Sequence, residues 1–260
     1  MPRLSIITAA WSPGARYLAQ TAESVRRQVL PRGWRLEWLV QEDGPRPDLL
    51  PRLAGLPRVR YEANGASLGL AATRNLALSR ATGDLVQVLD HDDLLLPGAL
   101  ARVAGAFRGP GIHWAVGQAD DLLADGSRRP YPSPLPYGLV PPGQVNAWSA
   151  AHGGRWPVHC AGLMMRTASL RAVGGWAGTP ADDDIAMFAA LSELGAGVNV
   201  AAVTWLYRLH PDQTHRSAGW QSRVPAARRI AAQRAAAIRE AGLTLATDPR
   251  SPDLTGTPAL

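Results

Sequence analysis

Three aspartates and a histidine stand together in the run Asp90-His91-Asp92-Asp93, directly after the apolar residues 85–89. Carboxylates crowded at the end of a buried strand oppose stability, because like charges repel and desolvation is costly. Alternate residues of a strand share a face, so we expect Asp90 and Asp92 to point to the same side. Oxygen ligands gathered in this way suit Mg²⁺ or Mn²⁺ bound to substrate phosphates. The run is equally compatible with a solvated turn in which Asp92 or Asp93 caps a following helix.

A second acidic run, Asp182-Asp183-Asp184, opens a segment that we predict to be a helix over residues 183–194. The helix dipole favours negative charge at this end, but the mutual repulsion of three carboxylates opposes their full ionisation. A carboxylate whose ionisation is opposed in this way is a candidate for general acid or base chemistry. The run is also compatible with a simple helix cap.

The first ninety residues alternate between short apolar runs and segments with helical periodicity. We expect strands at residues 4–7, 36–41, 59–61 and 85–89, and helices at residues 16–29 and 68–82. Helices between short buried strands predict a parallel sheet that is covered on both faces. In open sheets of this kind the ligand crevice lies outside the carboxyl ends of the strands, which is where the first acidic run falls.

The rest of the chain is less regular. We interpret residues 109–157, which hold many of the prolines and glycines, as loops with short strands on the substrate side. Further elements are expected at residues 162–165 and 197–203 (strands) and at residues 183–194 and 224–241 (helices). Residues 247–260 are rich in Pro, Asp, Ser and Thr and are expected to form a flexible tail.

Composition excludes several classes of protein. The 260 residues are 46% hydrophobic and 18% charged, enough to bury a sizeable core, and no apolar run approaches the roughly 18 residues that cross a bilayer. The single cysteine, Cys160, excludes an internal disulfide and a multi-cysteine zinc cluster. We therefore expect a globular, cytoplasmic protein.

The net charge of +6 comes from arginine, because the sequence contains no lysine. The first two hundred residues hold no dense basic run, so we expect no nucleic-acid partner. An anionic small substrate or a membrane surface explains the charge equally well. The C-terminal helix has its arginines among alanines. It either packs an alanine stripe on the protein and leaves its arginines in solvent, or it meets an anionic acceptor, or it touches the inner face of a membrane peripherally.

Both acidic runs belong to a longer series of motifs that resembles glycosyltransferase family 2, the inverting enzymes of the GT-A fold. The matching segments are Ala9-Ala10-Trp11, Glu42-Asp43-Gly44-Pro45, Thr73-Arg74-Asn75, Asp90-His91-Asp92-Asp93, His159-Cys160-Ala161-Gly162, Asp182-Asp183-Asp184 and Tyr207-Arg208-Leu209-His210. The series covers residues 4–217, and its order and spacing are specific although each member is weak.

This resemblance implies a fold and a division of the chain. It implies one Rossmann-like α/β domain over residues 1–246, with a central, mostly parallel sheet flanked by helices and a C-terminal helix over residues 224–241. Residues 1–110 would bind the nucleotide, and residues 111–217 would supply the acceptor and catalytic side.

The resemblance also implies a reaction. A hexose or N-acetylhexosamine would pass with inversion from a nucleotide-sugar to the hydroxyl of a small-molecule, glycan or lipid-linked acceptor, with Mn²⁺ or Mg²⁺ stabilising the leaving diphosphate. Asp92 would bind the metal with His210 as a second ligand, and Asp184 would be the base, with Asp183 beside the acceptor or a metal-side water. The residues expected to bind the nucleotide-sugar are Ala9, Ala10, Trp11, Asp43, Arg74, Asp90, His91 and Gly162.

Two parts of this assignment depend on departures from the family pattern. The contacts to the nucleobase rest mainly on stacking against Trp11 and on Asp43, which would accept an imide N–H. Uracil and thymine both offer that group, so a UDP-sugar is favoured and a dTDP-sugar is allowed. Three consecutive aspartates leave the register of the base ambiguous, and Met187 and Leu191 on the buried face favour Asp184.

Two other functions remain open at this point. A sugar-phosphate nucleotidyltransferase also uses aspartates at strand ends, but residues 11–14 contain no lysine and only one glycine. A non-catalytic nucleotide-sugar-binding module would not need the acidic run at 182–184. Tryptophans 148, 156, 176 and 220 lie in loop contexts where they would either stack on sugars or pack inside the protein.

Overall fold

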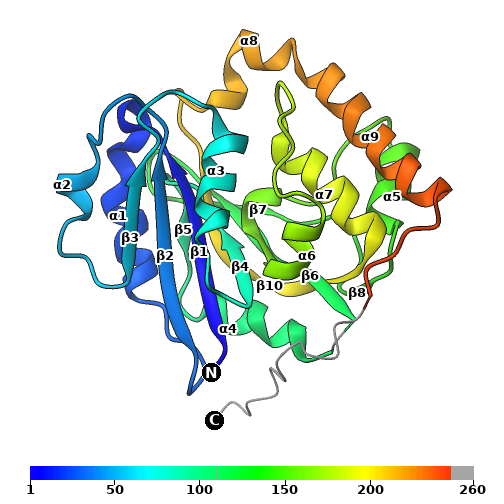
Figure 1. The fold of residues 1–260 in the computed structure, drawn as a ribbon, viewed down its shortest axis with the longest axis horizontal. Coiled ribbons are helices and arrows are strands. Elements are labelled where there is room, and N and C mark those ends of the chain that lie inside the picture. Colours follow the sequence, from blue (N-terminus) through cyan, green and yellow to red (C-terminus); the bar gives the residue numbers. More distant parts are fainter. Residues whose placement is uncertain (110, 247–260) are drawn as a thin grey trace.

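The computed structural model describes residues 1–109 and 111–246, and in it helices cover both faces of one mixed sheet (Figure 1). The strands are β1 (Arg3–Ala10), β2 (Arg35–Glu42), β3 (Val59–Ala63), β4 (Leu85–Val88), β5 (Leu94–Leu95), β6 (Ile112–Leu122), β7 (Arg128–Tyr131), β8 (Gly138–Val140), β9 (Leu163–Arg166) and β10 (Ala196–Arg208). The α-helices are α1 (Leu18–Arg26), α2 (Leu50–Leu53), α3 (Leu70–Ser79), α4 (Ala99–Ala104), α5 (Gln144–Ala151), α6 (Thr167–Ala172), α7 (Asp183–Leu194), α8 (Ala218–Gln221) and α9 (Val224–Glu240). Short 3₁₀ turns are η1 (Ser12–Tyr17), η2 (Gly105–Arg108), η3 (Cys160–Gly162) and η4 (Thr214–Arg216).

The sheet has the order β3-β2-β1-β4-β9-β6-β10-β5, with β7 paired to β6 and β8 paired to β10. Strands β1 to β4 pair in parallel, as do β6 and β10. Strand β9 runs antiparallel to both of its neighbours, β4 and β6. The strands β1, β2, β3, β4, β6 and β10 therefore all point the same way. The α/β fold with a mostly parallel central sheet is therefore confirmed. The carboxyl ends of β1, β4, β6 and β10 meet at one edge of this sheet.

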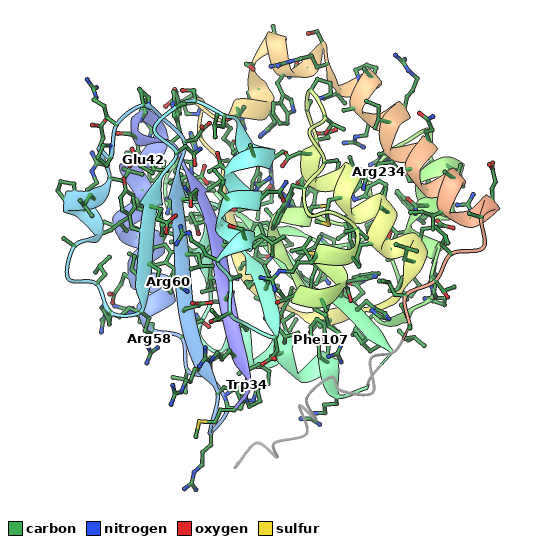
Figure 2. All side chains as sticks on the ribbon, viewed as in Figure 1. Trp34, Glu42, Arg58, Arg60, Phe107 and Arg234 are labelled. Atoms are coloured by element: carbon green, nitrogen blue, oxygen red, sulfur yellow. The ribbon has the colours of Figure 1, made fainter. Side chains whose placement is uncertain are left out.

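Alternate side chains of the strands enter two separate cores (Figure 2). On one face, Leu4 and Ile6 of β1 pack with residues of α1, α2 and α4. On the other face, Ile7 packs with residues of α3, α6 and α7. Both cores are continuous sets of aliphatic and aromatic side chains, which fixes the register of each strand and the positions of the residues at its end.

The C-terminal helix packs its alanine stripe on the protein. Ala227, Ala231 and Ala235 of α9 are buried, and α9 lies along α7. Arg239 binds Glu193 on that neighbouring helix, with Nε 2.8 Å from Oε1. The packed alternative for this helix is therefore confirmed, and peripheral membrane contact remains a prediction. The predicted tail over residues 247–260 lies outside the described residues.

Most of the elements expected from the sequence are present, but the interpretation of residues 109–157 as loops with short strands is wrong. This segment contains the eleven-residue strand β6, which lies inside the sheet, and the helix α5. The apolar pattern of β6 is interrupted because polar side chains are buried on it in pairs. Gln118 Nε2 donates to Asn199 Oδ1 at 2.7 Å, and His113 Nδ1 lies 2.9 Å from Ser169 Oγ.

Candidate functional site

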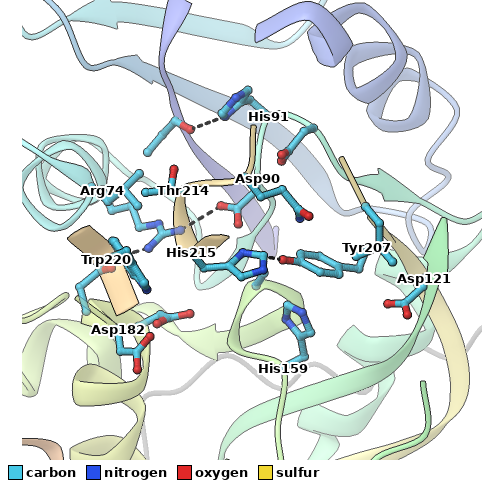
Figure 3. Close-up of a pocket in the computed structure, with 18 of the residues that line it drawn as sticks. Arg74, Asp90, His91, Asp121, His159, Asp182, Tyr207, Thr214, His215 and Trp220 are labelled. Carbon is cyan, nitrogen blue, oxygen red and sulfur yellow. Dashed lines mark hydrogen bonds and ion pairs between the residues drawn. The ribbon is translucent and has the colours of Figure 1, made fainter. Parts of the chain in front are cut away.

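A cavity of about 550 Å³ opens at the sheet edge where β1, β4, β6 and β10 end (Figure 3). Its wall includes the turn after β4, the β6–β7 hairpin, the η3 turn, the start of α7 and the chain that follows β10. The two acidic runs, ninety residues apart in sequence, both line it. The location agrees with the expected crevice at the carboxyl ends of parallel strands.

The first acidic run divides between the cavity and the core. Asp90 and Asp92 line the cavity together with His91, whose Nδ1 lies 3.3 Å from the Ala9 carbonyl oxygen. Asp93 is 1% exposed and accepts a hydrogen bond from the Arg208 backbone N–H. Burial, followed by the charge of Asp92, raises the pKa of the Asp93 carboxyl well above its usual range. The helix-cap alternative is wrong, because residues 94–95 form strand β5.

Arg74 joins the two acidic runs. Although it lies on helix α3, its side chain is 5% exposed; Nη2 is 2.9 Å from Asp90 Oδ1 and Nη1 is 2.9 Å from Asp183 Oδ2. Burial alone would lower the pKa of the guanidinium, but the charges of Asp183 and Asp90 outweigh that effect and raise it. The residue is therefore a fixed cation inside the site.

The three aspartates at the start of α7 have different partners. Asp182 is the N-cap residue, in the left-handed conformation, and forms an ion pair with Arg228 of α9. Asp183 pairs with Arg74. Asp184 lines the cavity, accepts a hydrogen bond from the Ile185 N–H at 2.8 Å, and forms no ion pair within the described chain. Burial, followed by the charge of Asp183, raises the pKa of the Asp184 carboxyl to about 7. A group with that pKa, facing a cavity, is suited to take up a proton near neutral pH.

Asp92 and His210 form a pair that fits a divalent metal ion. Asp92 Oδ2 lies 2.8 Å from His210 Nε2, so one carboxylate oxygen and one imidazole nitrogen are already adjacent. The other ring nitrogen, His210 Nδ1, is buried without a hydrogen-bond partner among the described residues. No group of three or more His, Cys, Asp or Glu side chains in residues 1–109 and 111–246 is arranged to hold a metal. This pair could supply two donors to Mg²⁺ or Mn²⁺, and the further positions of the ion would be open to diphosphate oxygens and water.

The residues expected to hold the nucleobase lie beside the cavity or behind its wall. Trp11 is 51% exposed at the end of β1, while Ala10 is buried and its carbonyl accepts the N–H of Asp43. The Asp43 carboxylate accepts the backbone N–H groups of Leu68 (2.6 Å) and Gly69 (3.0 Å), so it fixes the turn into α3. Of the four, Ala9 lines the cavity itself. The base contacts of Trp11 and Asp43 remain predictions.

Gly162 has a packing role in this structure. A β-carbon at this position would lie 2.2 Å from Trp205 Nε1, so the close approach of the η3 turn to the Trp205 ring requires glycine. Its neighbour Ala161 is the residue of this turn that lines the cavity. A contact between Gly162 and the donor sugar remains a prediction.

Several residues of the cavity wall were not among the site residues expected from the sequence, although His159 and Tyr207 belong to two of the motifs and Trp220 is one of the tryptophans that would stack on sugars or pack. They are Asp121, Arg129 and Tyr131 of the β6–β7 hairpin, His159, Tyr207, Thr214, His215, Trp220 and Arg228. Asp121 Oδ2 lies 2.6 Å from Arg129 Nη2 across the hairpin. The sequence held a signal for this pair, because two aspartates precede and two arginines follow the Asp125-Gly126 turn.

His159 stands against the rings of Tyr131, Trp205 and Tyr207, at centroid distances of 6.0, 4.7 and 4.4 Å. Burial lowers its pKa to about 4, so the imidazole is neutral at physiological pH. The adjacent segment after β10 is held to this aromatic group by Tyr207 Oη, which lies 3.2 Å from His215 Nδ1.

Residues 5–163 match the model of the family described as glycosyl transferase family 2, and the chain belongs to that family. Two uncharacterized proteins are similar over about half of the chain: y4gI of Sinorhizobium fredii (33% identity over 132 residues) and MT1568 of Mycobacterium tuberculosis (30% over 128 residues). The matches span 14% and 39% of those proteins, so the chain covers less than half the length of the curated relatives that it matches.

Solved structures of S. aureus TarS share the fold. TarS 1-349 in complex with UDP-GlcNAc superposes with a TM-score of 0.64 at 16% identity, over 84% of this chain and 61% of that one. The complex of TarS 1-349 with UDP superposes with a TM-score of 0.62, also at 16% identity, over 81% and 61%. This likeness confirms the GT-A fold. In the described part of the chain, no helix has the length and apolar character needed to span a membrane.

Proposed function

We propose that this chain is a metal-dependent inverting glycosyltransferase that moves a hexose or N-acetylhexosamine from a UDP-sugar to an acceptor hydroxyl, with Asp184 as the general base. The observation that carries the proposal is that one cavity holds both a pair of side chains suited to bind a metal and a carboxylate suited to accept a proton. Asp92 and His210 offer an oxygen and a nitrogen donor, and Asp184 offers a carboxylate of pKa about 7 without a cationic partner. The GT-A fold and the UDP and UDP-GlcNAc complexes of TarS support a uridine nucleotide as donor.

In this mechanism each half of the cavity has its own task. Ala9, Trp11 and Asp43 at the ends of β1 and β2 would hold the nucleobase, and Arg74, Asp90, His91 and Gly162 would surround the ribose, diphosphate and sugar. Asp92 and His210 would hold Mn²⁺ or Mg²⁺, which supplies positive charge against the leaving diphosphate. Residues 1–110 would thus form the nucleotide side and residues 111–217 the acceptor side of one domain over residues 1–246.

The chemical step is a displacement at the anomeric carbon. The acceptor oxygen forms a bond to that carbon while the bond to the diphosphate oxygen breaks, and the electron pair leaves with the diphosphate. Asp184 accepts the proton of the attacking hydroxyl. Arg74 holds Asp183 in place next to it, and the charge of Asp183 adds to the effect of burial in raising the pKa of Asp184.

A thermal-shift panel of UDP-, dTDP- and GDP-sugars, each with and without Mn²⁺, tests the donor assignment. A ligand at about 100 times its Kd stabilises a protein by roughly 2.7 kcal/mol, which is readily measured. We expect UDP-sugars to raise the melting temperature only when Mn²⁺ is present. A preference for GDP-sugars, or an equal shift without metal, would contradict the proposal.

A further inference from the structure

We infer that the acceptor is an uncharged sugar ring that stacks on Trp220, and that acceptors carrying phosphate or carboxylate are disfavoured. The inference rests on the proposed function and names the substrate class of its acceptor side. It is carried by the charge pairs of the cavity wall and by one indole ring that makes no hydrogen bond or ring contact within the described chain.

Every arginine that lines the cavity is already neutralised. Arg74 is shared by Asp90 and Asp183, and Arg129 pairs with Asp121 at 2.6 Å. The third cation, Arg228, pairs with Asp182 and donates through Nη1 to the Gly154 carbonyl at 2.9 Å. Among the described residues of the wall, no cationic side chain is therefore left for an anionic acceptor.

The remaining carboxylates make the balance of the wall negative. Among the described residues, six aspartates line the cavity against three arginines, and neither Asp92 nor Asp184 has an arginine partner. A divalent cation and the diphosphate of a nucleotide-sugar carry opposite charges, so their joint binding leaves this excess in place. An acceptor with a phosphate group would meet repulsion from the wall and from the donor. The cavity wall therefore suits a metal-bound donor together with a neutral acceptor.

Trp220 supplies the surface for such a ring. It lines the cavity, is partly exposed, and its side chain makes no hydrogen bond or ring contact within the described chain. Trp148 and Trp220 were expected in loops but lie in helices α5 and α8. The other tryptophans of the set are engaged: Trp148 stacks on His152 at 3.8 Å, Trp156 packs on Phe188, and Trp176 is buried. An aromatic face next to hydroxyl-binding carboxylates is the usual way to bind the apolar side of a sugar.

The position of Trp220 places it on the acceptor side. Helix α8 contacts α9, and α9 carries Arg228, which binds Asp182 at the start of α7 two residues before Asp184. In Figure 3, Trp220 lies on the side of Arg74 and Asp182, across from Tyr207 and Asp121. The backbone of α8 is fixed by Ser217, whose Oγ accepts the N–H of Trp220 at 3.2 Å. The ring therefore lies on the side of the cavity where Asp182 precedes α7.

The test is a set of glucosides, galactosides and mannosides that differ only in the charge of a short aglycone: 2-hydroxyethyl, 2-phosphoethyl, carboxymethyl and 2-aminoethyl. All ring hydroxyls are kept and the aglycones are of similar length, and transfer is scored only at ring hydroxyls by analysis of the product linkage, so differences in kcat/KM report mainly the charge. With a UDP-sugar and Mn²⁺, we expect the hydroxyethyl form of at least one ring to be at least tenfold better than its phosphoethyl and carboxymethyl forms. Equal or better use of an anionic form, a preference for the amine, or no transfer to any neutral ring would overturn the inference.

Two variants link the preference to the named residues. Trp220→Ala should raise the acceptor KM roughly three- to tenfold while leaving kcat and UDP-sugar binding unchanged, whereas Trp148→Ala should change neither. Asp182→Asn, which is compatible with the left-handed conformation, frees Arg228 and should improve kcat/KM for the phosphoethyl glycoside about tenfold. The matched control Asp120→Asn frees Arg128, which does not line the cavity, and should have no such effect.

These outcomes separate the two proposals. If UDP-sugars with Mn²⁺ fail to stabilise the protein, the proposed function falls. If they stabilise it but the anionic acceptors are preferred, or Trp220→Ala behaves like Trp148→Ala, only the acceptor inference falls.

Discussion

Arg74 Nη1 lies 2.9 Å from Asp183 Oδ2, and the two side chains are only 5% and 6% exposed. The other arm of the guanidinium holds Asp90 at the same distance. One side chain of α3 thereby ties the end of β4 to the start of α7. Because the guanidinium binds Asp183 and not Asp184, it fixes the start of the helix and leaves the next carboxylate in the cavity wall without an ion pair.

Replacing this cation should destabilise the fold. Arg74→Ala leaves Asp183 buried without a partner, and we expect the free energy of unfolding to fall by about 3–5 kcal/mol. Arg74→Lys keeps the charge but cannot reach both carboxylates in the same way, so the free energy of unfolding should fall by less than in Arg74→Ala. Chemical denaturation measures both. The control is Arg16→Ala, which breaks an exposed pair with Asp212 and should change the free energy of unfolding by less than about 1 kcal/mol. If Arg74→Ala changed it by no more than this control, the structural role of Arg74 would be refuted.

Asp184→Asn should lower kcat by about 10²–10⁴-fold, because the acceptor hydroxyl loses its proton acceptor. Its melting temperature should not fall, since the carboxyl is raised in pKa and has no cationic partner to lose. Asp183→Asn breaks the pair with Arg74 and should reduce stability as well as turnover. Kinetics and thermal unfolding of both variants decide the register. If Asp183→Asn alone abolishes transfer at unchanged stability, the base is one position earlier than proposed.

The parallel sheet and the helices around it could be predicted because their residues are apolar at the right period. Strand β1 and helix α7 are examples, and α7 spans residues 183–194 as expected. Strand β6 could not, because its buried polar side chains depend on partners such as Asn199 and Arg129 that come from distant or hairpin-linked segments. Hydropathy reports the average environment of a residue, not the presence of a specific partner.

The candidate site divides in the same way. Local motifs indicated that Asp90, Asp92 and Asp184 would stand at element ends, and all three line one cavity. The motifs could not indicate that Asp43 would hold the turn before α3, or that Gly162 would face the Trp205 ring. Those facts depend on which backbone groups the tertiary fold brings near each residue. That Trp220 lines the same cavity likewise follows only from three-dimensional packing.

Asp92→Asn should abolish the Mn²⁺-dependent part of the thermal shift produced by UDP, because it removes a charged oxygen donor next to His210. The melting temperature without ligand should stay close to that of the parent protein, since Asp92 is at the cavity and not in a core. Asp93→Asn is the matched control. Its carboxyl is buried with a raised pKa, so the amide should leave the metal response in place. A full Mn²⁺ response in Asp92→Asn would show that the metal ligand lies elsewhere, and chelation by EDTA should mimic the variant in the parent protein.

The pH dependence of transfer should report the raised pKa of Asp184. A general base works in its deprotonated form, so kcat should fall about tenfold per pH unit below a midpoint near 7, whereas an ordinary aspartate would stay active down to about pH 4. The same carboxyl contributes to stability with the opposite sign: because its folded pKa is raised, its contribution declines as pH rises from about 4 to 7. Loss of activity in mildly acidic buffer should therefore occur without loss of the folded state.

The charge of Asp183 is one cause of the raised pKa of Asp184, so in Asp183→Asn the midpoint of residual activity should move to lower pH. Rates measured at saturating UDP-sugar and Mn²⁺ from pH 5 to 8, with melting temperatures taken in the same buffers, test both signs at once. A midpoint that stays near 7 in Asp183→Asn, or one that lies near 4 in the parent protein, would assign the acid limb to another group.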